Sequence, residues 1–206
     1  MAETILLSID IEKGGNSPTK HPILAIGVCV GAVGGGALPR ILEKKTWCLR
    51  PLPGQEMEER CVREFWSNKQ DLLTKITECS IDALDGLRDF SRWLDDLATR
   101  FAEREIKLVS DNPAYDIGSI DFALCANGIR TVGIRYLGNE KYRSVCDPSE
   151  MIDGQGSWDL VKSKIAANHD HWPENDAEYI WWMYVHACQI RDQLSAGRRL
   201  SEVSLD

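Results

Sequence analysis

The chain has 206 residues, 43% of them hydrophobic, and its 32 acidic and 24 basic side chains leave a net charge of −8. A chain of this length can bury one sizeable core, so we expect a single domain over residues 1–206. The acidic balance disfavours tight wrapping of long duplex nucleic acid, but it does not exclude nucleic-acid chemistry, because bound cations supply a positive field where carboxylates gather.

Export and membrane insertion are not predicted. The opening MAETILLSID lacks the basic and long apolar regions of a secretory signal, and no window approaches the run of about 20 apolar residues that spans a bilayer. We therefore expect a cytoplasmic protein with no membrane partner. Seven cysteines lie far apart without a C-x-x-C pair, which excludes a zinc ribbon or thioredoxin-type site, and we expect most of them to be buried, reduced thiols.

The first part of the chain predicts three strands. Residues Thr4 to Ile11 (TILLSIDI) and Pro22 to Val30 (PILAIGVCV) are apolar and rich in branched side chains, and a third strand starts at Ile41. The glycines of the intervening GAVGGGALP fit neither G-x-G-x-x-G nor a P-loop, so this segment predicts a flexible hairpin connection.

The middle of the chain predicts helices, beginning around Glu58 to Trp66. A long helix is expected from Ile81 to Glu105, where apolar residues recur every three or four positions and form one face. That face consists of Leu87, Phe90, Leu94, Leu97 and Phe101. Core packing explains such a stripe better than a ligand site.

The last part alternates between strands and helices. A short strand (Ile106 to Ser110) runs into DNPAYD, where Asn112 and Pro113 suit the start of a helix to about Ala126. A fifth strand is expected from Thr131 to Leu137, followed by helices at about 158–167 and 176–194. This order predicts an α/β protein whose mixed five-stranded sheet begins with an antiparallel meander and carries helices on its faces.

Two carboxylates end the first predicted strand. Strand alternation places Ser8, Asp10 and Glu12 on one face, and residues two positions apart lie about 6.6 Å apart along a strand, so the two acids can lean together and share a cation. A strand that ends at the surface with its acids in solvent is the simpler interpretation of this pair alone. An EF-hand is excluded because its third ligand and terminal Glu are missing.

Two further segments contain acids in the first turn of a helix. Asp116 follows the fourth strand, and the helix dipole alone could account for it, while Asp111 is a rival for the same role. In HDHWPEND, Asn175 can cap the last helix and make Asp176 a first-turn acid, with Glu178 completing a capping box. That interpretation leaves His171 unexplained, and an imidazole that titrates at about pH 6.5 suits removal of a proton from water at a metal site.

Together these segments resemble one family. D-I-E in the first strand, D-N-P-A-Y-D at a strand-to-helix turn and H-W-P-E-N-D-A at the last helix are similar to the three motifs of the DEDDh 3′-5′ exonucleases. That superfamily has a ribonuclease H-like fold and includes oligoribonuclease, RNase T and proofreading domains. The motifs occur in the correct order, with a histidine five residues before the last acid, and span Asp10 to Asp176.

The resemblance implies a set of roles. Two Mg²⁺ or Mn²⁺ ions would be held by four carboxylates, and a histidine would act as general base. The implied metal ligands are Asp10, Glu12, Asp116 and Asp176, and the implied base is His171. The expected reaction releases nucleoside 5′-monophosphates from the free 3′ end of single-stranded or short RNA or DNA, and the resemblance makes a homodimer plausible.

Some features lie outside this pattern. His169 has the wrong offset for the base and is expected at the surface, and Lys13, Gly14 and Gly15 stand where many relatives have Thr and Gly. The alternatives are a binding or scaffold module of the same fold with weak catalysis, and a nuclease that cuts internally. A binding module has no need of acids whose like charges repel, which favours the enzyme.

Overall fold

The structure is a computed structural model that describes residues 3–129, 145–146, 152, 155–167 and 169–205. Its strands are β1 (Glu3–Lys13), β2 (Ile23–Gly34), β3 (Arg40–Cys48), β4 (Glu105–Val109) and β5 (Val145–Cys146). Its helices are α1 (Glu59–Glu64), α2 (Gln70–Cys79), α3 (Ala83–Arg100), α4 (Asp116–Ala126), α6 (Gln155–Lys164) and α7 (Pro173–Ser195). Two 3₁₀ turns, η1 (Trp66–Asn68) and η4 (Leu200–Glu202), complete the described elements.

The five strands form one mixed sheet in the order β3-β2-β1-β4-β5. Strands β1, β2 and β3 are antiparallel neighbours, whereas β4 lies parallel to β1 and β5 lies parallel to β4. The predicted mixed five-stranded sheet that starts with an antiparallel meander is therefore confirmed. The strand expected from Thr131 to Leu137 lies outside the described residues, and the fifth strand described is Val145–Cys146.

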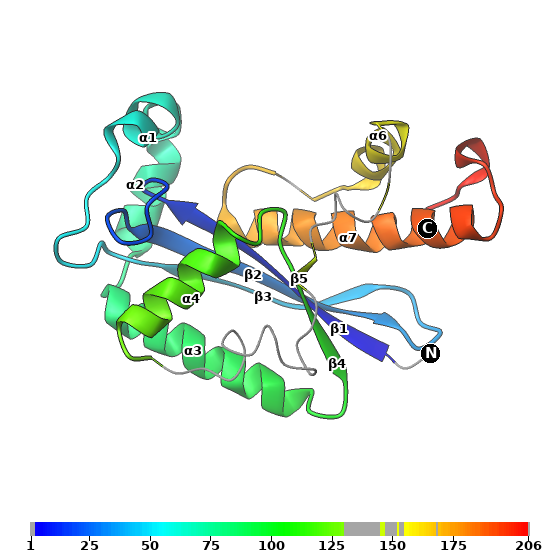
Figure 1. Cartoon of the computed structure of the whole chain (residues 1–206), viewed down its shortest axis with the longest axis horizontal. Coiled ribbons are helices and arrows are strands. Elements are labelled where there is room, and N and C mark those ends of the chain that lie inside the picture. Colours follow the sequence, from blue (N-terminus) through cyan, green and yellow to red (C-terminus); the bar gives the residue numbers. More distant parts are fainter. Residues whose placement is uncertain (1–2, 130–144, 147–151, 153–154, 168, 206) are drawn as a thin grey trace.

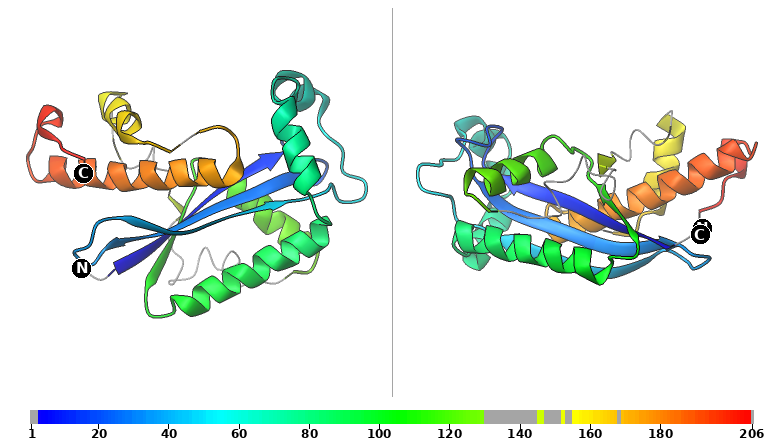
Figure 2. Two further views of the ribbon diagram at one scale, coloured as in Figure 1. Left: turned by 180° about the vertical axis from the view of Figure 1, so that it is seen from behind. Right: turned by 60° about the horizontal axis from the view of Figure 1, so that its bottom comes forward.

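Helices cover both faces of the sheet. Helices α6 and α7 lie on one face and α3 and α4 on the other, while α1 and α2 stand at one end (Figures 1 and 2). Alternate residues of β1 divide between the two cores: Ile5 and Leu7 pack with α3 and α4, and Leu6 packs with α7. The predicted stripe of α3 is buried in the first core, with Phe101 partly buried beside it.

Two helix starts differ from the predictions. Helix α4 begins at Asp116 and follows a turn in which Oδ1 of Asn112 accepts the backbone N–H of Tyr115 (3.3 Å). Helix α7 begins at Pro173, where a residue without an N–H is well suited to the first turn. The expected cap by Asn175 is therefore wrong, since that residue lies inside the helix.

The capping box is also replaced by other contacts. The side chain of Asn175 donates to the carboxylate of Asp170 (3.2 Å), and Glu178 pairs with Lys44 of β3 (2.6 Å). Both contacts hold the N-terminal part of α7 in place, the first against the preceding loop and the second against the sheet.

The described cysteines are all free thiols. Only Cys29 and Cys48 are buried; Cys61 and Cys188 are half-buried, and Cys79 and Cys125 are exposed. The expectation that most would be buried is therefore wrong for this part of the chain. Within the described ranges, no helix has the length and apolar character needed to cross a bilayer.

Candidate active site

The first motif lies on the face of β1 that α7 covers. The hydroxyl of Ser8 donates to the backbone carbonyl of Ala177 in α7 (2.5 Å), which shows how closely this face meets the helix. Asp10 and Glu12 continue along the same face by strand alternation. Because β1 runs on to Lys13 and Glu12 is only 7% exposed, the interpretation of these acids as a solvated strand end is wrong.

A glycine allows α7 to approach the sheet at this point. Gly27 of β2 is the direct cross-strand neighbour of Asp10. A Cβ atom at Gly27 would overlap the backbone of Pro173, the first residue of α7. The missing side chain thus lets the start of α7, with Asp176 in its first turns, lie beside the acids of β1.

Three of the predicted metal ligands come together. Asp10, Glu12 and Asp176 each offer a carboxylate oxygen, and these oxygens all lie within 4.8 Å of one another. Oδ2 of Asp10 is buried and has no hydrogen-bond partner among the described residues. A buried carboxylate oxygen without a donor is expensive unless a cation or a proton satisfies it, so this arrangement fits the binding of a divalent cation.

The electrostatics of the three acids agree with this interpretation. Burial raises the pKa of Asp10 well above its usual value, and repulsion from Glu12, Asp116 and Asp176 adds to the increase. Burial also raises the pKa of Glu12, although contact with His171 acts in the opposite direction, and it raises the pKa of Asp176. A bound cation would reverse these shifts by favouring the charged carboxylates.

Asp116, the fourth predicted ligand, is the first residue of α4. It is 2% exposed, and burial raises its pKa to about 7. The hydroxyl of Ser110, at the end of β4, donates to its Oδ2. Asp116 does not belong to the group of Asp10, Glu12 and Asp176, but repulsion from its charge raises the pKa of Asp10. The rival Asp111 is exposed, so burial favours Asp116 for this role.

The predicted base, His171, lies in the loop before α7. Its Nδ1 is 3.6 Å from Oε1 of Glu12 and 3.7 Å from Oδ2 of Asp176, and its ring meets the Phe65 ring edge-on, with the centroids 5.1 Å apart. Contact with Glu12 raises the pKa of the imidazole. The side chain is 27% exposed, so it both contacts the acids and reaches solvent.

The backbone of this loop is built around Asp176. Oδ1 of Asp176 accepts the N–H groups of Asp170 and His171, both at 3.1 Å. His171 has a φ of 64°, which makes it the only non-glycine with positive φ in the described part of the chain. Such strain is commonly kept where a side chain must point in a particular direction. The loop therefore does more than start a helix, because it aims the imidazole at the acids.

Two residues near the site were not predicted to be there. The side chain of His169 is 53% exposed, as expected of a surface residue, but its Nε2 lies 3.3 Å from Oδ2 of Asp176. Lys13 is 3% exposed; its Nζ donates to Ser119 (2.7 Å) and lies over the Tyr115 ring. The only signal in the sequence was a lysine directly after the first motif.

The end of β1 is also held from the side of α1 and α2. The indole N–H of Trp66, a residue 1% exposed, donates to the backbone carbonyl of Lys13 (3.1 Å). Nζ of Lys75 in α2 lies 3.4 Å from the centroid of the Trp172 ring in the loop before α7. These contacts connect the end of β1 to η1 and the loop before α7 to α2, so neighbouring segments support both sides of the acid cluster.

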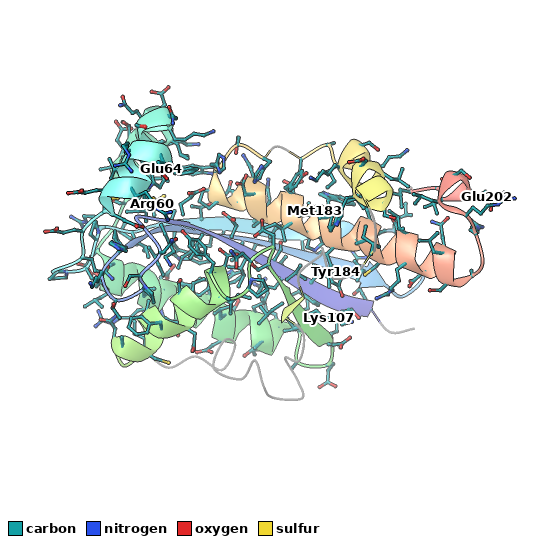
Figure 3. The ribbon with its side chains drawn as sticks, turned by 45° about the horizontal axis from the view of Figure 1, so that its top comes forward. Arg60, Glu64, Lys107, Met183, Tyr184 and Glu202 are labelled. Carbon is teal, nitrogen blue, oxygen red and sulfur yellow. The ribbon has the colours of Figure 1, made fainter. Side chains whose placement is uncertain are left out.

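One cavity lies away from this cluster. It has a volume of about 560 Å³, and its lining includes Leu6, Lys107 and Tyr184. Figure 3 shows Lys107 and Tyr184 toward the other end of the sheet from Arg60 and Glu64 of α1. None of the five predicted site residues is among the residues that line it.

Comparison with known proteins places the fold. No protein-family model matches the chain, and a search of curated proteins finds no match. Among solved structures, the nuclease domain of 3′hExo, a DEDDh family member bound to rAMP, matches with a TM-score of 0.50 and 15% identity over 98% of this chain and 96% of that one.

A second similar structure is a complex of E. coli exonuclease I with single-stranded DNA. Its zinc-bound form matches with a TM-score of 0.55 and 12% identity over 97% of this chain and 42% of the exonuclease I chain. The metal-free form matches with a TM-score of 0.54 and 8% identity. These likenesses show that the chain has the fold of DEDDh nuclease domains, as its motifs predicted.

Proposed function

We propose that the chain is a metal-dependent 3′-5′ exonuclease and that residues 1–206 form one catalytic domain. Its substrate would be single-stranded or short nucleic acid with a free 3′ end, and its products nucleoside 5′-monophosphates. The observation that carries the proposal is the convergence of the Asp10, Glu12 and Asp176 carboxylates, one of whose oxygens, Oδ2 of Asp10, is buried without a donor. Nδ1 of His171 faces the carboxylates of Glu12 and Asp176.

The proposed cofactor is a pair of Mg²⁺ or Mn²⁺ ions held by Asp10, Glu12, Asp116 and Asp176. When bound, such ions make water a stronger nucleophile at neutral pH and neutralise charge on the phosphate and the leaving oxygen. Four carboxylates in a site this buried repel one another without cations, which is why the donor set fits hard divalent ions with oxygen preference.

The protein's own groups would orient the attack and move the proton. Nδ1 of His171 faces the carboxylates of Glu12 and Asp176, so these acids fix the ring and leave Nε2 as the atom that accepts a proton from water. The contact of Phe65 with the ring edge restrains the same imidazole. The left-handed backbone of His171 keeps it over the acids before substrate arrives.

The substrate class is supported by two kinds of observation. The similar structures contain rAMP in one case and single-stranded DNA in the other. The net charge of −8 disfavours long duplexes, whose binding depends on many contacts between basic side chains and phosphates. Short single strands carry fewer phosphates, so their binding needs fewer basic side chains.

The test is a time course on matched 5′-labelled DNA and RNA oligonucleotides with Mg²⁺, Mn²⁺ or EDTA. We expect shortening that needs metal and that Asp10→Asn reduces by at least about 10²-fold, because the variant keeps the size of the side chain and loses its charge. Asp111→Asn is the matched control and should retain most turnover. Equal activity of Asp10→Asn and the parent protein would overturn the metal site.

A further inference from the structure

A second group of metal-ligating side chains overlaps the acid cluster. His169, His171 and Asp176 each present one ligand atom, and these three atoms lie within 4.8 Å of one another. Both imidazoles face the same oxygen: Nε2 of His169 is 3.3 Å and Nδ1 of His171 is 3.7 Å from Oδ2 of Asp176. His169 has no part in the proposed hydrolysis, so its position here calls for another explanation.

The spacing fits a small tetrahedral ion. Zinc binds imidazole nitrogen and carboxylate oxygen at about 2.0–2.1 Å, so two ligand atoms of a tetrahedral site lie about 3.3–3.4 Å apart. The two nitrogen-to-oxygen distances, 3.3 and 3.7 Å, are already near this value. Small side-chain rotations would complete the site.

The shared carboxylate is oriented for this purpose. Oδ1 of Asp176 is occupied by the N–H groups of Asp170 and His171, which leaves Oδ2 facing the two imidazoles. Hydrogen bonds that hold the second oxygen of a ligating carboxylate strengthen metal sites. The His169 ring also lies 5.2 Å from the Tyr179 ring in α7, which limits where the imidazole can turn.

Two imidazoles and one carboxylate select a different ion from the acid cluster. Nitrogen ligands favour Zn²⁺, Co²⁺ and similar transition metals, whereas Mg²⁺ and Mn²⁺ prefer oxygen. The exposed side chain of His169 leaves the site open to solvent, so a fourth ligand could be water. Filling this site competes with filling the acid cluster, because Oδ1 of Asp176 accepts two backbone N–H groups and Oδ2 is the oxygen left for a metal.

We propose that His169, His171 and Asp176 form a Zn²⁺-class transition-metal site, and that its occupation switches off the exonuclease. Coordination would take Oδ2 of Asp176 from the catalytic cluster and draw Nδ1 of His171 away from Glu12, which removes one metal ligand and disorients the base. Zinc binding rests only on the described side chains, whereas the inhibitory effect rests on the proposed function.

Direct binding of metal to the whole 206-residue chain tests the first half of the proposal. Stripped protein is titrated with Co²⁺ and followed by visible absorption, and Zn²⁺ affinity is measured by competition with a chromophoric chelator. We expect a tetrahedral Co²⁺ spectrum that Zn²⁺ displaces, and an affinity for Zn²⁺ at least about 10-fold weaker in His169→Ala. His21→Gln, which removes a histidine outside the cluster, is the control and should bind as the parent does.

The cysteines provide a second check. Thiolate ligands give Co²⁺ an additional strong charge-transfer band, and alkylation of the thiols would abolish binding that depends on them. Equal Zn²⁺ affinity in His169→Ala and the parent, or loss of binding after alkylation, overturns the proposal.

Inhibition is then measured at saturating Mg²⁺ with added Zn²⁺. We expect the parent to lose turnover as the site fills and His169→Ala to need at least about 10-fold more Zn²⁺ for the same loss. Equal sensitivity of the two proteins would overturn the inhibitory half.

Asp10→Asn separates the two proposals. Under both, it loses turnover and keeps parental Zn²⁺ affinity, because Asp10 is not a ligand of the second site. Zinc binding in a parent without exonuclease activity would leave the site standing and overturn the function. Exonuclease activity in a parent protein that does not bind zinc would support the proposed function and overturn the zinc site.

Discussion

Buried carboxylates govern how the metal-free protein responds to pH. Burial raises the pKa of Asp116 to about 7, above a value of about 3.9 for an unfolded chain. Between these values the folded chain keeps a proton that the unfolded chain has lost. The contribution of the protonated Asp116 carboxyl group to the free energy of unfolding is therefore complete below the lower pKa. It is lost as pH rises through the higher pKa.

We accordingly expect the stability of the metal-free protein to fall as pH rises from about 4 to about 7, and Asp116→Asn to make that fall shallower. Thermal unfolding in EDTA across this range measures both. Added Mg²⁺ should restore stability most at the upper end, where the acids are charged. A slope that is identical in Asp116→Asn and the parent would show that Asp116 does not titrate there.

His171 combines a proposed chemical role with an unusual backbone conformation, and two substitutions separate them. His171→Ala and His171→Asn should each reduce turnover by about 10²-fold, the usual contribution of a general base. Asn tolerates a φ of 64° better than Ala, so His171→Asn should be the more stable variant, by up to about 1–2 kcal/mol.

Single-turnover kinetics and chemical denaturation provide the two measurements for this pair. If His171 served only to start the helix, His171→Asn would keep full turnover per folded molecule. That outcome would remove the imidazole from the mechanism and leave the acids in place.

At the level of elements, the site depends on how closely α7 approaches β2. Gly27→Ala should displace the start of α7 from the sheet, because the added methyl group would overlap the backbone of Pro173. We expect a loss of about 1–3 kcal/mol in stability and a larger relative loss of turnover, since Asp176 moves away from Asp10. Denaturant unfolding and turnover per folded molecule measure the two effects.

Gly118→Ala is the matched control, because Gly118 is exposed on α4 and its nearest other atom would be 4.0 Å from the new methyl group. It should be neutral or stabilising by up to about 1 kcal/mol. Parental activity and stability in Gly27→Ala would mean that close contact between α7 and β2 is not what assembles the acids.

For the whole molecule, the proposed chemistry has a direction. A terminal nucleotide must sit beside the acids with its 3′-hydroxyl in a place that leaves no path for a continuing chain. A 5′-labelled strand should shorten one nucleotide at a time, a 3′-phosphate should slow it strongly, and a 5′ block should matter little until the substrate is very short.

Circular single strands provide the sharpest version of this prediction, because they should survive incubation that digests the matched linear strand. Gel analysis of the two substrates with Mg²⁺ is sufficient. Rapid cutting of circles would show that the same acids serve an endonuclease.

The amino-acid sequence alone was enough for the order and type of most described elements and for the family resemblance. Strand alternation correctly placed Ser8, Asp10 and Glu12 on one face, and the three-four spacing correctly predicted the buried stripe of α3. These features are local: each depends on a repeat of two or about 3.6 residues, which can be counted along the chain.

Other features required the folded chain, because they depend on contacts between residues far apart in sequence. Nothing local marks Gly27 as the residue at which α7 crosses the sheet. The start of α7 is different, since Pro173 at the first helical position is a local signal that the predicted cap at Asn175 overlooked. Burial, which separates Asp116 from Asp111, is likewise a property of the assembled sheet and helices.

The clearest case is His169. Its offset of seven residues from Asp176 did not match the motif, and sequence alone indicated a surface residue. Asp176 accepts two backbone N–H groups and so closes a turn in the preceding loop. This turn brings the His169 ring to within 3.3 Å of the Asp176 carboxylate. The sequence thus determined which residues could do chemistry, whereas the tertiary structure decided which of them share a carboxylate oxygen, because that depends on a loop whose hydrogen bonds close only when α7 is in place.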